Sequence, residues 1–287
     1  MNAQRIAIIT DSGTCVAPQF IKDHDIFVVP LRVCYSDGST YESGVNITPE
    51  EILARFEQEI PTTSLPSPQA ILHTLEQARD KGYERAVIVT IASKLSATYE
   101  TMRLVAEQMP DFPTVVIDSR SIGMVAGMVC ERAAEFIERG GSFDEVEAYT
   151  ERYADYSRVY FCAKTLDYVY KGGRINGAIY RISKVLNIKP ILTCGSDGAY
   201  TLAKKARGWE KALDMMGSII EDHANEWGAC RISICTSSIN EELDPFYERR
   251  FKLSIPQAIE VTHADISAEL LVHTGPDLIG LGIQKVL

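Results

Sequence analysis

Short apolar runs alternate with segments of helical spacing along most of this chain. Residues 86–91 are largely apolar and β-branched, which is typical of a strand buried on both faces of a sheet. After a polar loop, Met102, Val105, Ala106 and Met109 recur at helical spacing, so we expect a helix from residue 97 onward. Further strands are expected at residues 5–10, 26–33, 114–117, 158–162, 189–192, 200–205, 231–236 and 257–261.

Helices are expected in most of the intervals between these strands. Thr48, Pro49 and Glu51 form a strong helix start, because they supply a capping hydroxyl, a proline at the first helical position and a glutamate three residues after the cap. The other helices are expected at residues 18–23, 69–81, 123–139, 143–156, 209–225 and 241–250, and from Arg174 to about residue 186. This alternation predicts an α/β fold.

The length and one glycine-rich break indicate two domains. A chain of 287 residues commonly forms about two domains, and Gly140, Gly141 and Ser142 interrupt the pattern before a charged helix. We expect residues 1–157 to form an N-terminal α/β domain with a mostly parallel sheet and helices on both faces. Residues 158–287 are expected to form a mixed α/β domain, with a hairpin turn at 195–198.

Four polar loops lie at the ends of predicted strands or before predicted helices, at residues 11–14, 62–68, 93–98 and 118–121. In an open α/β sheet such loops gather along one edge, where ligands bind. The N-termini of helices at that edge favour a carboxylate or a phosphate. The loops therefore suggest one anion site made from several strand ends. The alternative is that hydroxyls such as those of Ser67, Ser96 and Thr98 only cap helices.

Composition narrows the function further. A net charge of −10 argues against binding to nucleic acid or to an acidic membrane surface. The apolar runs are too short to span a bilayer, and the start of the chain does not resemble a signal peptide. The seven scattered cysteines suggest reduced thiols in the cytoplasm. No P-loop, GxGxxG, GxSxG, HExxH or metal-like cysteine spacing occurs in the sequence. This absence disfavours the common classes of nucleotide-binding protein, hydrolase and metalloprotein.

Two further residues are ambiguous by themselves. Arg174 follows two glycines and could approach a phosphate or carboxylate closely, although its spacing alone favours a solvated arginine at a helix end. His273 is expected at the end of a strand before a Gly-Pro turn. A lone histidine is more often structural than catalytic, and the sequence reveals no serine or aspartate partner for it.

Several motifs in this order make the chain resemble the DegV family over nearly its whole length. They are Thr10-Asp11-Ser12, residues 63–68 (TSLPSP), residues 93–99 (SKLSATY), residues 118–121 (DSRS), residues 166–175 (LDYVYKGGRI), residues 188–192 (IKPIL) and residues 273–276 (HTGP). The resemblance implies two α/β domains that bind a long-chain fatty acid, with its carboxylate at the domain junction and its acyl chain buried. It implies no other cofactor, and it implies a carrier that presents the fatty acid to a separate kinase, which forms an acyl phosphate.

The same resemblance assigns roles to particular residues. Thr63 and Ser96 match the family hydroxyls that hold the carboxylate, and His273 matches the histidine near it. Ser64, Ser93 and Ala97 belong to the same motifs and are expected at the same site. Ala97 replaces the usual glycine, so a left-handed backbone there would be costly; Gly13 is a milder departure. Arg174 and Arg207 match basic positions associated with the kinase step.

Two hypotheses of different classes remain. The first is a non-catalytic lipid carrier in the cytoplasm, for which transient membrane contact stays open. The second is an enzyme that acts on a small acidic or phosphorylated metabolite through Asp11, His273 and the hydroxyl-bearing loops. The sequence lacks a recognisable metal cluster, nucleotide-binding loop or nucleophile–base pair, which favours the carrier.

Overall fold

A parallel sheet with helices on both faces forms the N-terminal half of the molecule. The computed structural model describes residues 2–185, 187–237 and 243–287. The sheet has the order β2-β1-β6-β7 and is parallel throughout. Its strands are β1 (Ile6–Asp11), β2 (Phe27–Val29), β6 (Arg85–Thr90) and β7 (Thr114–Asp118). The predicted α/β character and parallel pairing are confirmed.

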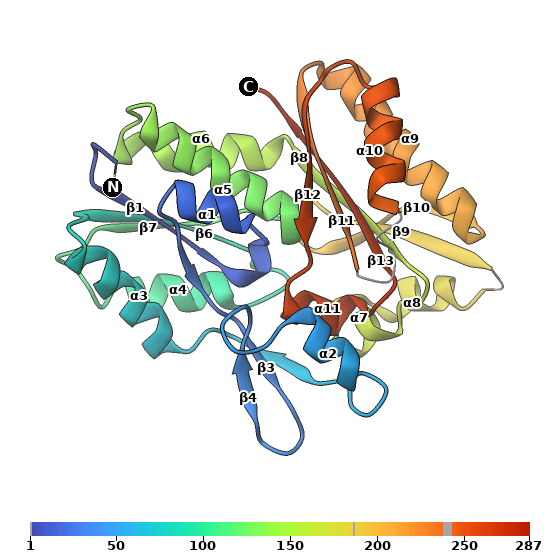
Figure 1. Cartoon of the computed structure of the whole chain (residues 1–287), viewed down its shortest axis with the longest axis horizontal. Coiled ribbons are helices and arrows are strands. Elements are labelled where there is room, and N and C mark those ends of the chain that lie inside the picture. The colour runs from blue at the N-terminus through green and yellow to red at the C-terminus, as the bar shows by residue number, and fades with distance from the viewer. Residues whose placement is uncertain (1, 186, 238–242) are drawn as a thin grey trace.

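The strands of this sheet are apolar on both faces, as the sequence predicts. Ile6 and Ile8 of β1 pack in one hydrophobic cluster with α5, whereas Ala7 and Ile9 pack in another with α3 and α4. Figure 1 shows α3 and α4 on one face and α5 and α6 on the other. The helices are α1 (Pro18–Asp23), α3 (Pro68–Asp80), α4 (Thr98–Ala106), α5 (Gly123–Glu138) and α6 (Phe143–Asp155), with a short 3-10 turn, η1, at Ser12–Thr14.

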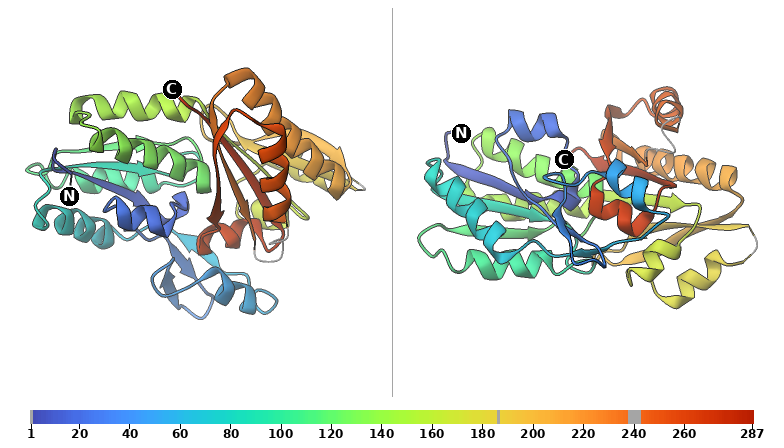
Figure 2. Two further views of the ribbon diagram at one scale, coloured as in Figure 1. Left: turned by 45° about the horizontal axis from the view of Figure 1, so that its top comes forward. Right: turned by 60° about the horizontal axis from the view of Figure 1, so that its bottom comes forward.

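The prediction of one continuous strand at residues 26–33 is wrong, because the chain passes from one sheet to another at Pro30. β2 lies at the edge of the parallel sheet, where a following proline without an N–H is tolerated. The next segment starts a separate antiparallel sheet, made of β3 (Arg32–Cys34), β4 (Thr40–Glu42) and β5 (Thr62–Ser64). The β3–β4 hairpin projects from the molecule (Figure 2), and α2 (Pro49–Arg55) follows with the predicted capping box.

A six-stranded mixed sheet forms the C-terminal half, in the order β10-β9-β8-β13-β11-β12. Its strands are β8 (Ser157–Ala163), β9 (Ile188–Cys194), β10 (Tyr200–Arg207), β11 (Cys230–Thr236), β12 (Ala258–Asp265) and β13 (Leu278–Lys285). Among the described strands of this sheet, only β11 and β12 pair in parallel. The domain boundary after residue 157 remains a prediction, and β8 of the new sheet begins there.

Long helices cover one face of this second sheet. α9 (Trp209–Trp227) and α10 (Leu243–Ser254) pack on it, and α7 (Asp167–Lys171) and α8 (Gly177–Ser183) lie between β8 and β9 in the chain. The helix expected from Arg174 is shorter than predicted, and residue 186 lies outside the described residues. Residues 241 and 242 of the helix expected at 241–250 also lie outside them.

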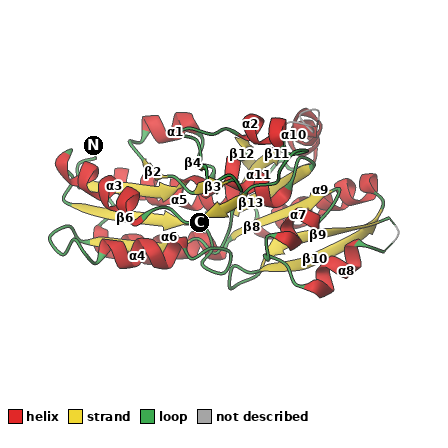
Figure 3. Cartoon of the chain, turned by 90° about the horizontal axis from the view of Figure 1, so that it is seen from below, coloured by secondary structure: helices red, strands yellow, loops and turns green. Residues whose placement is uncertain are grey.

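The two main sheets lie at opposite ends of the long axis, and helices fill the space between them (Figures 1 and 3). α5 contacts strands of both sheets, and α11 (Ala268–Thr274) contacts β3, β5 and α7. These contacts belong to a hydrophobic cluster that joins the two halves of the chain. The prediction that His273 ends a strand is therefore wrong, because His273 lies in α11. So short an apolar run has no periodicity that separates a strand from a helix.

Candidate functional site

Thr63 and His273 form the centre of the candidate site. Thr63 is the middle residue of β5 and His273 lies near the end of α11, so each side chain comes from a well-defined element. The Thr63 Oγ1 lies 2.7 Å from the His273 Nε2, although 210 residues separate them in the chain. Both side chains are partly buried. The pair therefore joins the antiparallel sheet to α11.

The imidazole of His273 is held in its neutral form. Burial, together with the nearby charge of Arg174, lowers the pKa of His273 to about 4. A neutral imidazole has one nitrogen that donates and one that accepts. At neutral pH this histidine can therefore donate a single hydrogen bond, but it brings no positive charge of its own to an anion.

Arg174 supplies the positive charge at this place. Its Nε donates to the carbonyl oxygen of Leu95 at 3.3 Å, and its Nη1 donates to the carbonyl oxygen of Gly172. A Cβ at Gly172 would lie 2.5 Å from the Nδ1 of His273, so only glycine permits this close approach. The double glycine thus serves to bring the backbone of this loop against the histidine.

The 93–98 loop lies next to Arg174 through Leu95. The Ser96 Oγ is 2.8 Å from the Thr98 Oγ1 and accepts a bond from the Thr98 N–H, so these hydroxyls also order the start of α4. Ala97 has a φ of −75°. The expected cost of replacing the family's glycine does not arise, because this backbone conformation is open to alanine.

Tyr200 lines two cavities. One, of about 400 Å³, is lined by Lys94, Leu95, Tyr200 and residues 172–176. The other is a small apolar cavity of about 40 Å³, lined by Tyr200 with residues such as Met124, Phe161, Leu270 and Gly280. A polar and an apolar cavity on either side of one residue suit a ligand that has both a charged and an apolar part.

Other predicted site residues lie elsewhere or have other partners. The Ser64 Oγ accepts a bond of 3.1 Å from Arg32, whose Nε also donates to the Leu65 carbonyl. Ser93 is exposed, and its N–H donates to the carboxylate of Asp118. Arg207 is exposed at the opposite end of β10 from Tyr200, about 23 Å away at about 3.3 Å per residue from 200 to 207.

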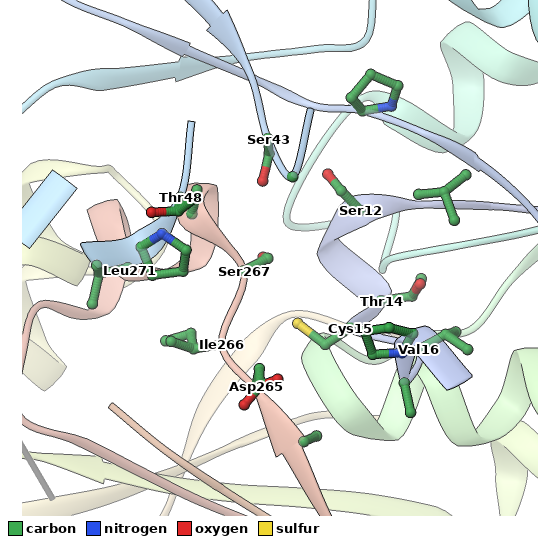
Figure 4. Close-up of a pocket in the computed structure, with 18 of the residues that line it drawn as sticks. Ser12, Thr14, Cys15, Val16, Ser43, Thr48, Asp265, Ile266, Ser267 and Leu271 are labelled. Carbon is green, nitrogen blue, oxygen red and sulfur yellow. The ribbon is translucent and has the colours of Figure 1, made fainter. Parts of the chain in front are cut away.

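The loop at residues 11–14 belongs to a different cavity, of about 680 Å³, which Figure 4 shows. Asp11 is fully buried, and its two carboxyl oxygens accept N–H bonds from Gly13 and Ile91. Within the described contacts, the partner of the His273 Nε2 is the Thr63 hydroxyl and not a carboxylate. These contacts offer no support for the enzyme hypothesis, which pairs Asp11 with His273.

A family model decides the classification. The model described as "Uncharacterised protein, DegV family" matches residues 5–286. The chain belongs to the DegV family. A DegV domain-containing protein of Clostridium perfringens is 34% identical over 282 residues, which cover 98% of this chain and 99% of that protein. One from Clostridium acetobutylicum is 33% identical over 282 residues, which cover 98% of this chain and 99% of that protein.

Solved DegV structures share the whole fold. One described as "Fatty Acid Binding of a DegV family Protein from Thermus thermophilus" has a TM-score of 0.89 and 29% identity, and the match covers 98% of this chain and 100% of that one. A stearic acid-binding protein from Eubacterium ventriosum has a TM-score of 0.87 at 24% identity, covering 99% of this chain and 98% of that one. The likeness to the Eubacterium ventriosum protein supports the fold alone, because the identity is only 24%.

Sequence reasoning about this DegV chain missed Arg32 and the true setting of Ser64. Arg32 lies in the segment after Pro30. Its contact to Ser64 depends on the pairing of two three-residue strands, which are too short to be predicted from the sequence. Within the described residues no group of three or more His, Cys, Asp or Glu could hold a metal ion. None of the described helices is both long and apolar enough to cross a membrane.

The neutral state of His273 predicts how stability varies with pH. The unfolded histidine has a pKa near 6.5 and the folded one about 4, so the unfolded chain binds the extra proton between these values. The free energy of unfolding should fall by roughly 2 kcal/mol as pH drops from 6.5 to 4, after allowance for partial exposure. His273→Gln should lack this contribution in denaturant unfolding measured across that range.

The comparison with the variant is necessary because the titration of Asp11 changes the free energy of unfolding with pH in the opposite direction. Burial raises the pKa of Asp11 to about 7, so its contribution lowers stability as pH rises from about 4 to 7. That contribution is the same in both proteins and cancels in the difference. Identical pH profiles for the two proteins would show that His273 is not held neutral by the fold.

Proposed function

We propose that this protein binds a long-chain fatty acid, with the carboxylate at Thr63 and His273 and the acyl chain in the apolar cavity. The observation that carries the proposal is the Thr63–His273 pair, since His273 directly precedes Thr274, which lines the apolar cavity. The likeness to the Thermus thermophilus protein, which is described as binding fatty acid, adds support at 29% identity.

The energetics favour such a ligand. Each buried methylene contributes about 0.8 kcal/mol, so a long chain supplies most of the binding free energy. The carboxylate would replace the bond between Thr63 and His273 and accept one bond from the Thr63 hydroxyl and one from the Nε2–H of the neutral imidazole. The charge of Arg174 lies close enough to affect that histidine. Ser96 is proposed to complete the head-group site with neighbouring backbone N–H groups, as its motif implies.

Entry of the acyl chain requires side chains to move. A cavity of about 40 Å³ is little larger than the roughly 30 Å³ that one water occupies. Met124 is well suited to such a movement, because its side chain is flexible and its Cε lies against the backbone of Gly280. We therefore propose that the chain displaces Met124 and follows β13.

The protein is proposed to be a carrier without catalysis of its own, which presents the fatty acid to a separate kinase for acyl-phosphate formation. The matching positions Arg174 and Arg207 support this role. A cytoplasmic location is proposed with it, because all seven cysteines are unpaired, as a reducing compartment favours.

Arg207→Ala should leave fatty-acid affinity unchanged but slow acyl-phosphate formation by a fatty acid kinase. The reason is that Arg207 is exposed and remote from Tyr200, so it can contact a partner but not the acyl chain. Lys205→Ala, another exposed cation of β10, is the matched control. A loss of lipid affinity with normal transfer of the lipid that remains bound would contradict this role.

Mass spectrometry of an organic extract tests the proposed function at its simplest. The protein purified from a bacterial host should release close to one equivalent of a fatty acid with a long acyl chain. The delipidated protein should rebind palmitate or oleate. An extract free of fatty acid, together with a delipidated protein that binds neither, would refute fatty-acid binding.

A further inference from the structure

A cavity in the described part of the chain is distinct from the proposed head-group site, because neither Thr63 nor His273 lines it. It has a volume of about 680 Å³ and lies between the end of β1, the start of α2 and the end of β12 (Figure 4). Leu271 of α11 lines this cavity whereas Leu270 and Thr274 of the same helix line the apolar one, and Ile266 lines both. A volume of this size is typical of small-molecule sites.

The walls of this cavity combine apolar surface with hydroxyls and carboxylates. Figure 4 shows Ser12, Ser43, Ser267 and Asp265 around one space, and these residues come from both halves of the chain. Apolar walls are supplied by Val16, Ile21, Val28, Leu53, Ile266 and Leu271. Four lining residues are acidic, Asp11, Glu50, Asp244 and Asp265, and none of the described lining residues is a lysine or arginine.

A buried acidic residue lies directly behind this wall. Glu269 is only 2% exposed, and its Oε1 accepts a 2.7 Å bond from the Ser12 Oγ, whose residue lines the cavity. Its Oε2 has no hydrogen-bond partner among the described residues. Asp11, which is fully buried, is close enough for the two carboxyls to repel each other.

This negative charge has no internal counter-ion in the part of the chain that the structure describes. The ion pairs described there include neither Asp11 nor Glu269, so only hydroxyl and backbone N–H groups contact these two carboxyls. A buried carboxylate without a cation is costly. A cation in the adjoining cavity would remove that cost.

We propose that this cavity binds a small organic amine, with its ammonium group at Ser12, Ser267 and Asp265 and its apolar body against Val28, Leu53 and Ile266. An ammonium group donates to several oxygens at once. Its positive charge would also attract the carboxylates of Glu269 and Asp265, which form no described ion pair. An organic cation fits better than a metal ion, since the described residues contain no metal-ligating group and the cavity walls are largely apolar.

Calorimetric titration with three six-carbon probes tests this assignment: n-hexylamine, 1-hexanol and hexanoate at pH 7. Hexylamine should bind at least tenfold more tightly than hexanol, and hexanoate should bind least. Saturation with palmitate and the Thr63→Ala substitution should leave the preference for hexylamine over hexanol unchanged, because Ser12, Ser267 and Asp265 do not line the apolar cavity and Thr63 does not line this one. The proposed function can therefore fail without affecting this result.

Two substitutions locate the amine. Asp265→Asn and Glu269→Gln should each lower the advantage of hexylamine over hexanol by at least fivefold, whereas Glu260→Gln, an exposed acid of β12 that does not line the cavity, should not. Asp265 is exposed, so its variant should fold even if the Glu269 variant does not. Equal affinity for hexylamine and hexanol, displacement by palmitate, or an unchanged preference in Asp265→Asn would overturn the proposal.

Discussion

Replacing Gly280 by leucine should weaken binding of palmitate or oleate by a hundredfold or more. Gly280 lines the apolar cavity, where its missing side chain leaves room beside Met124, whose Cε would lie 3.1 Å from an added Cβ. A leucine would occupy the path of the acyl chain. Loss of four buried methylenes costs about 3 kcal/mol, which is roughly a hundredfold in affinity.

The stability of the ligand-free variant separates this effect from misfolding. Met124 is flexible and can yield to the new side chain, so delipidated Gly280→Leu should lose only about 1–3 kcal/mol of stability and still unfold cooperatively. Ala203→Leu adds similar volume to the same sheet, where Ala203 packs against the cluster beneath α9, and should preserve affinity. Full affinity in Gly280→Leu would place the chain elsewhere.

Replacing Thr63 by alanine should weaken fatty-acid binding about tenfold to a hundredfold. The expected loss is one hydrogen bond to a charged group, about 1.5–3 kcal/mol. Ser96→Ala should show a similar loss if its hydroxyl also contacts the carboxylate. Affinities are best measured by fluorescence displacement or calorimetry, together with the melting temperature of each variant.

Ser64→Ala is the matched control for Thr63→Ala. Successive residues of a strand face opposite ways, and the Ser64 hydroxyl accepts a bond from Arg32 while that of Thr63 faces His273. We expect Ser64→Ala to change affinity less than twofold. Unchanged affinity in Thr63→Ala, Ser96→Ala and the double variant would contradict the proposed head-group site.

Local periodicity was sufficient to predict the long elements. The apolar run at 86–91 is found as β6 with a shift of one residue, and the hairpin around 195–198 joins β9 and β10 as expected. These segments carry their own pattern of buried positions or turn residues. The α/β class and the parallel pairing of the N-terminal sheet follow from such patterns.

Short elements depend on contacts that are distant in the sequence. β5 has three residues and becomes a strand only by pairing with β3. The apolar residues of α11 pack in the hydrophobic cluster that joins the two halves of the chain. The Thr63–His273 contact requires both elements. The motifs placed these residues at one site by resemblance, but nothing local in the sequence could supply the helix, the contact or the neutral imidazole.

A crystal structure of the protein saturated with palmitate tests the central claim most directly. The account predicts a carboxylate oxygen within about 2.7–3.2 Å of the Thr63 Oγ1 and the His273 Nε2. It predicts the acyl chain between Met124, Phe161 and Gly280, with Met124 moved aside. Palmitate seated instead in the cavity lined by Ser12 and Asp265, or bound only at the surface, would contradict it.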